Sequence, residues 1–168
     1  ACNTNAPDEG NMYLLGHVGS PFLKERFLTP LVEGRARSAF FMTEPAEWGG
    51  AGSDPSMMKT TCRLDGNHWV IDGRKCFATG AQGANVAIVM ARAEEGACMF
   101  LVDLPDPAIR IDHIPNTIDN SMPGGHAIVA IENLRVPADQ MLGQSGEGFK
   151  YAQIRLSPAR LSHCMRWL

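Results

Sequence analysis

The chain has 168 residues and a formal net charge of −3, with 45% hydrophobic and 20% charged residues. This length allows one domain with a hydrophobic core, or a piece of a larger protein. The charge balance gives no basic surface for nucleic acid, no apolar run approaches the roughly 18 residues of a membrane span, and the chain starts without a signal-peptide pattern. The composition therefore predicts a soluble globule.

The cysteines and the ends of the chain give two further expectations. The five cysteines are scattered and form no C-x-x-C pair, which fits free thiols in a reducing compartment. The chain starts without methionine, and residues 166–168 continue a helical pattern that no glycine or proline ends. We therefore expect an internal segment of a longer protein.

The first 35 residues predict helices and their connections. Ser20 and Pro21 have the residue types of an N-cap and of the first helical position. The apolar residues that recur near helical spacing, up to Gly34, are Phe22, Phe27, Leu28, Leu31 and Val32. A helix is expected over this stretch.

From Ser38 onward, short β-type runs alternate with turn residues such as Asp65-Gly66-Asn67 and Asp72-Gly73. The runs cover residues 38–43, 57–64, 68–72, 74–79, 86–92, 98–104, 109–114 and 126–136. This spacing predicts a mainly β fold, an antiparallel β-barrel or sandwich, with helical segments at both ends.

Two segments indicate what packs around this sheet. Residues 86–91 are apolar on both strand faces, so this strand is expected to be covered on both sides. From Phe149 onward the pattern is helical, with an interruption at Ser157-Pro158, where proline should kink or restart the helix. The expected order is helical, then β, then helical.

Several kinds of site lack their sequence pattern. The five histidines show no metal-ligand spacing, so no metal site is predicted. The Gly-Gln-Ser-Gly stretch at residues 143–146 is not a nucleophile elbow, and the glycines at 49–52 match neither a dinucleotide fingerprint nor a P-loop. A hydrolase and a classical nucleotide fold are not supported.

One loop and one strand end do suggest a ligand. Residues 42–61 gather glycines, hydroxyls and acids where a strand-like run ends, which suits a loop whose backbone approaches a bulky, polar ligand. Phe77 and Thr79 are two positions apart at another strand end and should face the same side. A planar ligand with several hydrogen bonds fits both features, although a core phenylalanine beside a surface threonine would give the same local pattern.

Three motifs follow one another along the chain: Phe-Met-Thr-Glu-Pro at 41–45, Gly-Ser-Asp-Pro at 52–55 and Trp-Val-Ile-Asp-Gly-Arg-Lys-Cys-Phe-Ala-Thr-Gly at 69–80. Together they resemble the acyl-CoA dehydrogenase flavoprotein family. The resemblance implies the end of an N-terminal helical domain at 1–36, a middle β-domain at 37–137 and the start of a C-terminal helical domain at 138–168. Cys2, Ala-Pro-Asp at 6–8 and His-Cys-Met-Arg at 163–166 are most similar to the large, often multidomain members that act on longer or branched acyl groups.

The resemblance implies a binding site for flavin adenine dinucleotide (FAD). Thr43 matches the residue that hydrogen-bonds the pyrimidine side of the flavin ring, with Met42 beside it. Phe77 matches a position, usually tryptophan, that stacks on the ring, and Thr79 matches the threonine that reaches flavin N5. Ser53 matches the serine at the pyrophosphate and at the mouth of the coenzyme A site.

The same resemblance implies an activity, the oxidation of the Cα–Cβ bond of acyl-CoA thioesters to trans-2-enoyl-CoA. Arg160 matches an arginine near the nucleotide end of the thioester. The family's general base is expected beyond Leu168, so no catalytic residue is assigned in this chain and the fragment is expected to be inactive. An electron-transfer flavoprotein or similar acceptor, a homo-oligomer, and the bacterial cytoplasm or mitochondrial matrix are further expectations.

Two departures from the family pattern leave alternatives open. The loop at 47–50 is longer than usual, which affects the phosphate contact, and Phe77 lacks the indole N–H of tryptophan. A flavin-dependent oxidase or monooxygenase of the same fold, and a flavin-free β-domain that serves as a binding module, remain alternative functions.

Overall fold

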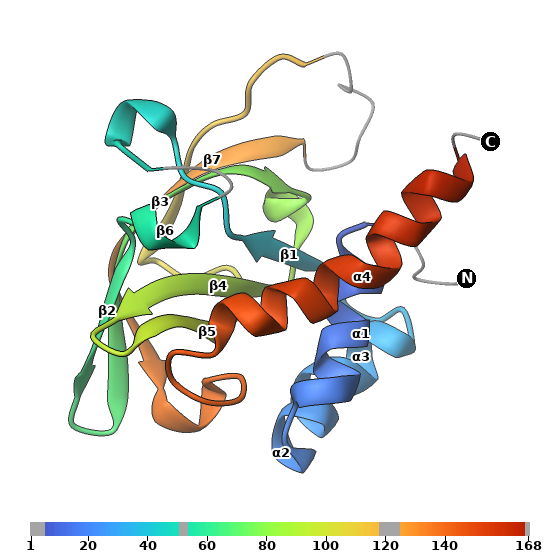
Figure 1. The fold of residues 1–168 in the computed structure, drawn as a ribbon, viewed down its shortest axis with the longest axis horizontal. Coiled ribbons are helices and arrows are strands. Elements are labelled where there is room, and N and C mark those ends of the chain that lie inside the picture. Colours follow the sequence, from blue (N-terminus) through green and yellow to red (C-terminus); the bar gives the residue numbers. More distant parts are fainter. Residues whose placement is uncertain (1–5, 51–53, 118–124, 167–168) are drawn as a thin grey trace.

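The computed structural model describes residues 6–50, 54–117 and 125–166, and its centre is a curled seven-stranded sheet with helices packed on one side (Figure 1). The strands are β1 (Ser38–Phe41), β2 (Thr61–Asp65), β3 (His68–Thr79), β4 (Val86–Ala93), β5 (Gly96–Asp103), β6 (Ile109–His113) and β7 (His126–Pro137). The α-helices are α1 (Asp8–Val18), α2 (Pro21–Leu23), α3 (Thr29–Val32) and α4 (Gly148–Arg166). The predicted mainly β class with helical ends is confirmed.

The sheet order is β1-β4-β2-β3-β7-β6, with β5 on β4. Most pairings are antiparallel, as predicted. Strand β4, however, pairs in parallel with β1 over residues 86–89 and with β2 at Arg92. One edge of β4 is therefore shared by two strands that come from different parts of the chain, which the residue pattern alone did not predict.

Strand β4 is buried on both faces from Val86 to Ala91, as its continuous apolar run predicts. Ala87 and Val89 lie in the core inside the curled sheet, whereas Ile88 and Met90 lie in a second core against the helices. The covering layer consists of helices from both ends of the chain. Because side chains alternate along a strand, one strand joins both cores.

The N-terminal helical stretch begins as predicted, since the Ser20 hydroxyl accepts a hydrogen bond of 3.2 Å from the Leu23 amide. It does not continue as one α-helix, because α2 and α3 are joined by a π-helical turn at Lys24–Leu28. At Ser157-Pro158 the alternative of a restarted helix is wrong, since α4 continues through Pro158 as one element.

The predicted turn at Asp72-Gly73 is wrong: both residues lie inside the continuous strand β3. The register against β7 shifts between Ile71 and Gly73, where Asp72 alone faces two residues of β7, so the bulge lies in β7 at Glu132 and Asn133. The Asp72 carboxylate accepts the Asn133 amide at 2.7 Å. A Cβ at Gly73 would lie 2.4 Å from Oγ1 of buried Thr60. Glycine is needed here for close approach of the two chain segments.

This contact predicts the effect of adding a methyl group. We expect Gly73→Ala to lower the free energy of unfolding by about 1–3 kcal/mol, because Thr60 and strand β3 must move apart. Gly16→Ala in α1 is the matched control, since a Cβ there meets nothing within 4 Å and helix propensity should raise stability by about 0.5–1 kcal/mol. Urea denaturation measures both, and equal effects at the two sites would contradict the assigned contact.

Candidate functional site

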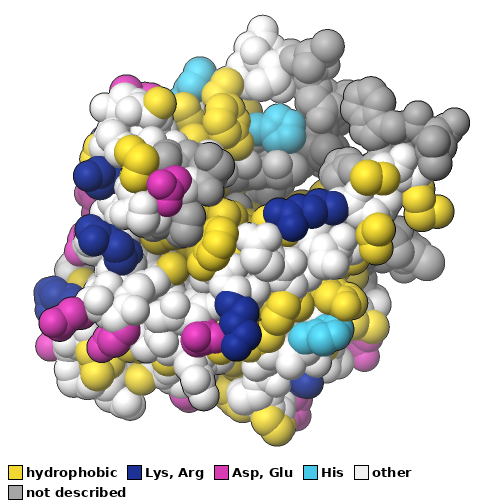
Figure 2. Space-filling view, viewed as in Figure 1, with side chains coloured by type: hydrophobic (Ala, Val, Ile, Leu, Met, Phe, Trp, Pro, Cys, Tyr) yellow, Lys and Arg dark blue, Asp and Glu magenta, His cyan; other side chains and the backbone are white. Residues whose placement is uncertain are grey.

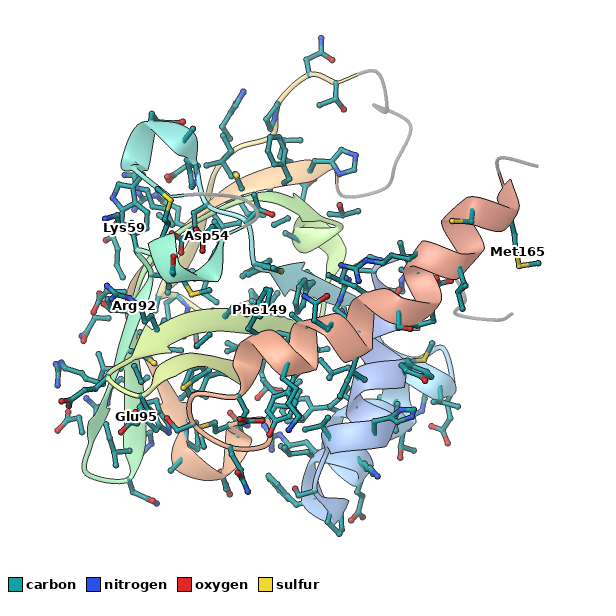
Figure 3. All side chains as sticks on the ribbon, viewed as in Figure 1. Asp54, Lys59, Arg92, Glu95, Phe149 and Met165 are labelled. Atoms are coloured by element: carbon teal, nitrogen blue, oxygen red, sulfur yellow. The ribbon has the colours of Figure 1, made fainter. Side chains whose placement is uncertain are left out.

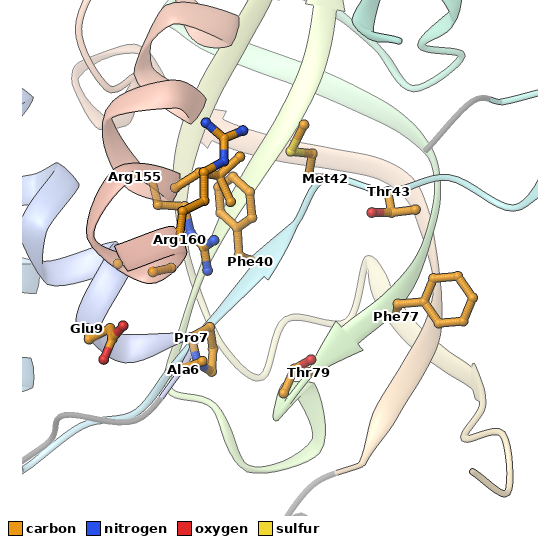
Figure 4. A pocket seen from close by; sticks show the side chains of 13 residues that line it. Ala6, Pro7, Glu9, Phe40, Met42, Thr43, Phe77, Thr79, Arg155 and Arg160 are labelled. Atoms are coloured by element: carbon orange, nitrogen blue, oxygen red, sulfur yellow. The ribbon is translucent and has the colours of Figure 1, made fainter. Parts of the chain in front are cut away.

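A cavity of about 330 Å³ lies between the sheet and helices α1 and α4 (Figure 4). Its lining residues are Ala6, Pro7, Glu9, Gly10, Phe40, Met42, Thr43, Phe77, Thr79, Arg155, Leu156, Ala159 and Arg160. Five of the predicted site residues, Met42, Thr43, Phe77, Thr79 and Arg160, are therefore brought together. Ser53 lies outside the described residues.

Phe77 forms one wall of the cavity in an unusual conformation. Its φ of 53° is in the left-handed region, and its side chain is 63% exposed. Both features carry a cost, because a bulky residue rarely adopts positive φ and an aromatic ring is normally buried. The register of β3 against β7 shifts between Lys75 and Ala78, so the simple strand alternation used to pair Phe77 with Thr79 does not hold there. The alternative of a core phenylalanine is wrong.

Thr79 ends β3 beside the first residue of β7. Its hydroxyl lies 2.9 Å from Nδ1 of His126, which pairs with it across the two strands. The imidazole orients the hydroxyl at the cavity wall, and sequence reasoning missed this contact because 47 residues separate the two positions.

Met42 and Thr43 follow β1, and the backbone of both is fixed by β3. The Cys76 amide donates to the Thr43 carbonyl at 2.8 Å, and Nζ of Lys75 donates to the Met42 carbonyl at 3.1 Å. Figure 4 shows Thr43 and Thr79 on the strand side of the cavity and Arg155 and Arg160 on α4. The cavity therefore has a wall of hydroxyls and an aromatic ring opposite a wall that carries positive charge.

Beneath this loop lies a buried ion pair. Nζ of Lys75 is 2.9 Å from Oε1 of Glu44, and both side chains are almost completely buried. The carboxylate also accepts the backbone amides of Lys59 at 2.6 Å and Thr60 at 2.9 Å. The pair thus ties the segment after β1 to β3 and to the segment before β2.

The pKa values of the two groups follow from their surroundings. Burial opposes the ionisation of Glu44, but the Lys75 ammonium and the hydrogen-bond donors of Thr60 and Lys59 together hold its pKa below the usual range. Burial lowers the pKa of Lys75 to about 8, against the attraction of Glu44. Both groups are charged at neutral pH, and the pair has a structural role.

Gly50, in the glycine cluster after this loop, allows close approach to a buried side chain. A Cβ at Gly50 would lie 2.4 Å from Cβ of Glu44. The predicted approach of this loop to a ligand stays a prediction. Gly49 adopts φ 77° and ends a short helical turn. Asp54 also has a structural role, since its carboxylate accepts the amide and hydroxyl of Ser56.

Arg160 lines the outer part of the cavity, and its Nη1 donates to the Gln153 side chain at 3.1 Å. Sequence reasoning missed two other cavity residues, Phe40 and Arg155. No signal in the sequence marked them, because Phe40 reads as a strand residue and Arg155 as one polar position of a helix. Within the described ranges, no cluster of three or more histidine, cysteine or acidic side chains could bind a metal ion. None of the helices described here combines the length and hydropathy of a membrane span.

The fold and this cavity define a β-domain with a candidate ligand site between its sheet and helices α1 and α4. The sequence profile of the acyl-CoA dehydrogenase middle domain matches residues 39–126. The chain belongs to the acyl-CoA dehydrogenase family, whose members are FAD-dependent oxidoreductases.

Individual relatives agree with this family. The protein named probable acyl-CoA dehydrogenase FadE2 of Mycobacterium tuberculosis is 40% identical over all of this chain and 42% of its own length. Acyl-CoA dehydrogenase family member 11 of Gallus gallus is 37% identical over 98% of this chain and 22% of its own length. The chain thus spans less than half of these relatives.

Solved structures show the same fold. A Mycobacterium abscessus protein assigned as an acyl-CoA dehydrogenase superposes with a TM-score of 0.89 at 41% identity, over 98% of this chain and 42% of that one. A glutaryl-CoA dehydrogenase from Mycobacterium smegmatis, solved in complex with FADH2, gives a TM-score of 0.76 at 28% identity, over 89% of this chain and 37% of that one.

The buried ion pair makes a prediction about the loop that it anchors. Lys75→Met should lower the free energy of unfolding by about 3–5 kcal/mol, because the Glu44 carboxylate stays buried without its counter-charge. Hydrogen exchange at the Cys76 amide, which bonds Thr43, should become faster. Lys150→Met is the matched control, since Lys150 pairs with Glu147 on the surface and its loss should cost less than about 1 kcal/mol.

The double variant Glu44→Leu with Lys75→Met separates charge from packing. It should recover much of the stability lost in Lys75→Met, because no unpaired charge remains buried. A double variant that is less stable than the single one would show that the pair is not the cause.

Proposed function

We propose that this chain is the flavin-binding β-domain of an acyl-CoA dehydrogenase that oxidises the Cα–Cβ bond of acyl-CoA thioesters to trans-2-enoyl-CoA. The observation that carries the proposal is the exposed ring of Phe77, held at positive φ on the wall of a cavity that also has two threonine hydroxyls. Such a conformation is maintained where the surrounding structure fixes it, and it occurs often at ligand sites.

The residues present fit a flavin ring. A planar heteroaromatic ring needs an aromatic or apolar surface against its face and hydrogen-bond groups at its edges. Phe77 and Met42 offer the surfaces, and Thr43 and Thr79 offer hydroxyls on two separate elements. We assign these four residues to FAD, and Ser53 to the pyrophosphate and the mouth of the coenzyme A site. The solved glutaryl-CoA dehydrogenase with FADH2 has the same fold, which supports this assignment.

The residues of this chain bind the cofactor and the thioester and orient them. When bound, FAD supplies the acceptor for the hydride that leaves Cβ of the thioester. Phe77 and Met42 exclude water from one side of the cavity, His126 orients the Thr79 hydroxyl, and Arg160 offers positive charge to the nucleotide part of coenzyme A. Hydroxyl donors at the flavin edge favour negative charge there, which assists reduction.

Further parts of the function are proposed for the whole protein. We infer that the general base lies outside these 168 residues, since the chain spans 42% of FadE2, and that the chain alone does not turn over substrate. We propose domain limits at residues 36–37 and 137–138, an electron-transfer flavoprotein as acceptor, a homo-oligomer, and a bacterial cytoplasmic or mitochondrial location. Exposed apolar side chains on α4, Phe149 at its start and Met165 at its end (Figure 3), support packing against further helices. Figure 2 shows separate hydrophobic side chains at the surface on the side of the molecule where α4 lies.

The absorption spectrum of the full-length protein tests the proposal. Flavin bands that an acyl-CoA bleaches without oxygen are expected. Bands that are re-formed rapidly by oxygen would favour an oxidase or monooxygenase instead, and a colourless protein that takes up no added FAD would favour the binding module.

Phe77 provides a sharper prediction. In the full-length protein, Phe77→Ala should weaken FAD binding about 3- to 10-fold, since loss of aromatic contact costs about 0.5–1.5 kcal/mol. Phe22→Ala is the matched control, because Phe22 is 45% exposed on α2 and does not line the cavity. Fluorescence titration of the apoprotein with FAD measures both, and equal affinities of the two variants would remove Phe77 from the site.

A further inference from the structure

Arg155 is a buried, positively charged residue on the wall of the cavity, and the proposed function gives it no role. It lies on α4, five residues before Arg160, and 9% of its surface is exposed. Arginine is rarely buried to this degree unless its charge and its donors are matched. The contacts of its guanidinium therefore show what the cavity is built to bind.

Two residues, Asn11 and Phe40, contact the guanidinium and hold it in place. Nε of Arg155 donates to Oδ1 of Asn11 at 2.8 Å, and Cζ of Arg155 lies 4.0 Å from the centre of the Phe40 ring. The Asn11 amide is itself oriented, because Nδ2 donates to the Ser38 hydroxyl at 2.9 Å. A Cβ at Gly10 would lie 3.3 Å from Cγ of Arg155, so glycine in α1 leaves room for the side chain. The arginine is thus positioned by α1 and β1 together.

The two terminal nitrogens of the Arg155 guanidinium take no part in these contacts. Among the residues that the structure describes, neither Nη1 nor Nη2 of Arg155 has a hydrogen-bond partner. The described residues also include no completely buried side-chain nitrogen or oxygen without a partner. The terminal nitrogens must therefore retain access to the cavity that Arg155 lines (Figure 4).

The Arg155 guanidinium keeps its positive charge in spite of burial. Burial lowers the pKa of Arg155 to about 10, against the attraction of Glu9, so the guanidinium is protonated at neutral pH. Its contacts with Asn11 and Phe40 are with uncharged groups. A second positive side chain, Arg160, lines the same cavity beside a single carboxylate, Glu9.

We propose that Arg155 binds a carboxylate on the ligand that enters this cavity and selects it over a plain hydrocarbon chain. With Nε used by Asn11, the free end of the guanidinium presents two parallel donors, the geometry that binds a carboxylate in bidentate fashion. A purely aliphatic acyl chain would displace water from these two donors without offering a hydrogen-bond acceptor in its place. This inference rests on the proposed function, under which the ligand is the acyl part of a coenzyme A thioester with a carboxylate on the acyl chain.

Binding of matched thioesters to the flavin-loaded full-length protein tests the proposal. The change in the flavin spectrum is titrated with glutaryl-CoA against pentanoyl-CoA and with adipyl-CoA against hexanoyl-CoA. The wild type should prefer the carboxylated member of a pair about 10- to 100-fold, the range expected for charge-assisted hydrogen bonds. Arg155→Met should abolish the preference, and Arg155→Lys should keep part of it because lysine lacks the bidentate fork.

Arg160→Met is the control, since it should weaken the binding of both thioesters of a pair alike. The ratio of their two affinities should then stay at the wild-type value. A wild type without preference would overturn the proposal even if no variant folds. An Arg155→Met protein that keeps the wild-type ratio, or that loses stability and both affinities equally, would make Arg155 a structural residue.

A second readout separates this inference from the proposed function. If the full-length protein binds no flavin, the proposed function fails, and the NMR signal of the Arg155 Nε–H group is then followed during titration with glutarate. A saturable shift, absent when pentanol replaces glutarate, would retain a carboxylate site at Arg155. No shift would overturn it.

Discussion

The site depends on one buried interaction, the ion pair between Glu44 and Lys75. Two charges inside a protein are costly unless hydrogen bonds complete their shells, and here the two backbone amides of Lys59 and Thr60 and the Met42 carbonyl do so. Because the partners come from three separate segments, the pair fixes where the chain after β1 runs. Met42 and Thr43 reach the cavity as a consequence.

The rest of the fold places the opposite wall of the cavity, formed by α1 and α4, across from the segment that carries Met42 and Thr43. Strand β4 is buried on both faces and carries one core inside the sheet and another beneath the helices. On the helix side, the Asp8 carboxylate at the start of α1 accepts the Ser38 amide and hydroxyl, each at 2.6 Å, and Asn11 joins Ser38 to Arg155. A polar chain thus connects α1, β1 and α4. The cavity between sheet and helices therefore has hydroxyls on one side and guanidinium groups on the other.

Local patterns predicted much of this fold, and contacts distant in sequence account for the rest. The double-sided burial of β4 and the Ser20 cap could be predicted because each depends on neighbouring residues. The Asp72-Gly73 pair was misread as a turn because the same dipeptide lies inside a strand here, opposite a bulge of β7 and with Thr60 packed against Gly73. The motif resemblance predicted that Thr43, Phe77 and Thr79 share a site. His126 and Arg155 could not be found this way, since their partners are 47 and 144 residues away.

The central claim is that the Glu44–Lys75 pair holds the strand-side wall of a flavin site. A crystal structure of the full-length protein with FAD tests it most directly. The account predicts that the flavin ring contacts Thr43, Phe77 and Thr79, with the ion pair and the positive φ of Phe77 unchanged. A flavin bound elsewhere, or a Phe77 that moves into a core on binding, would contradict it.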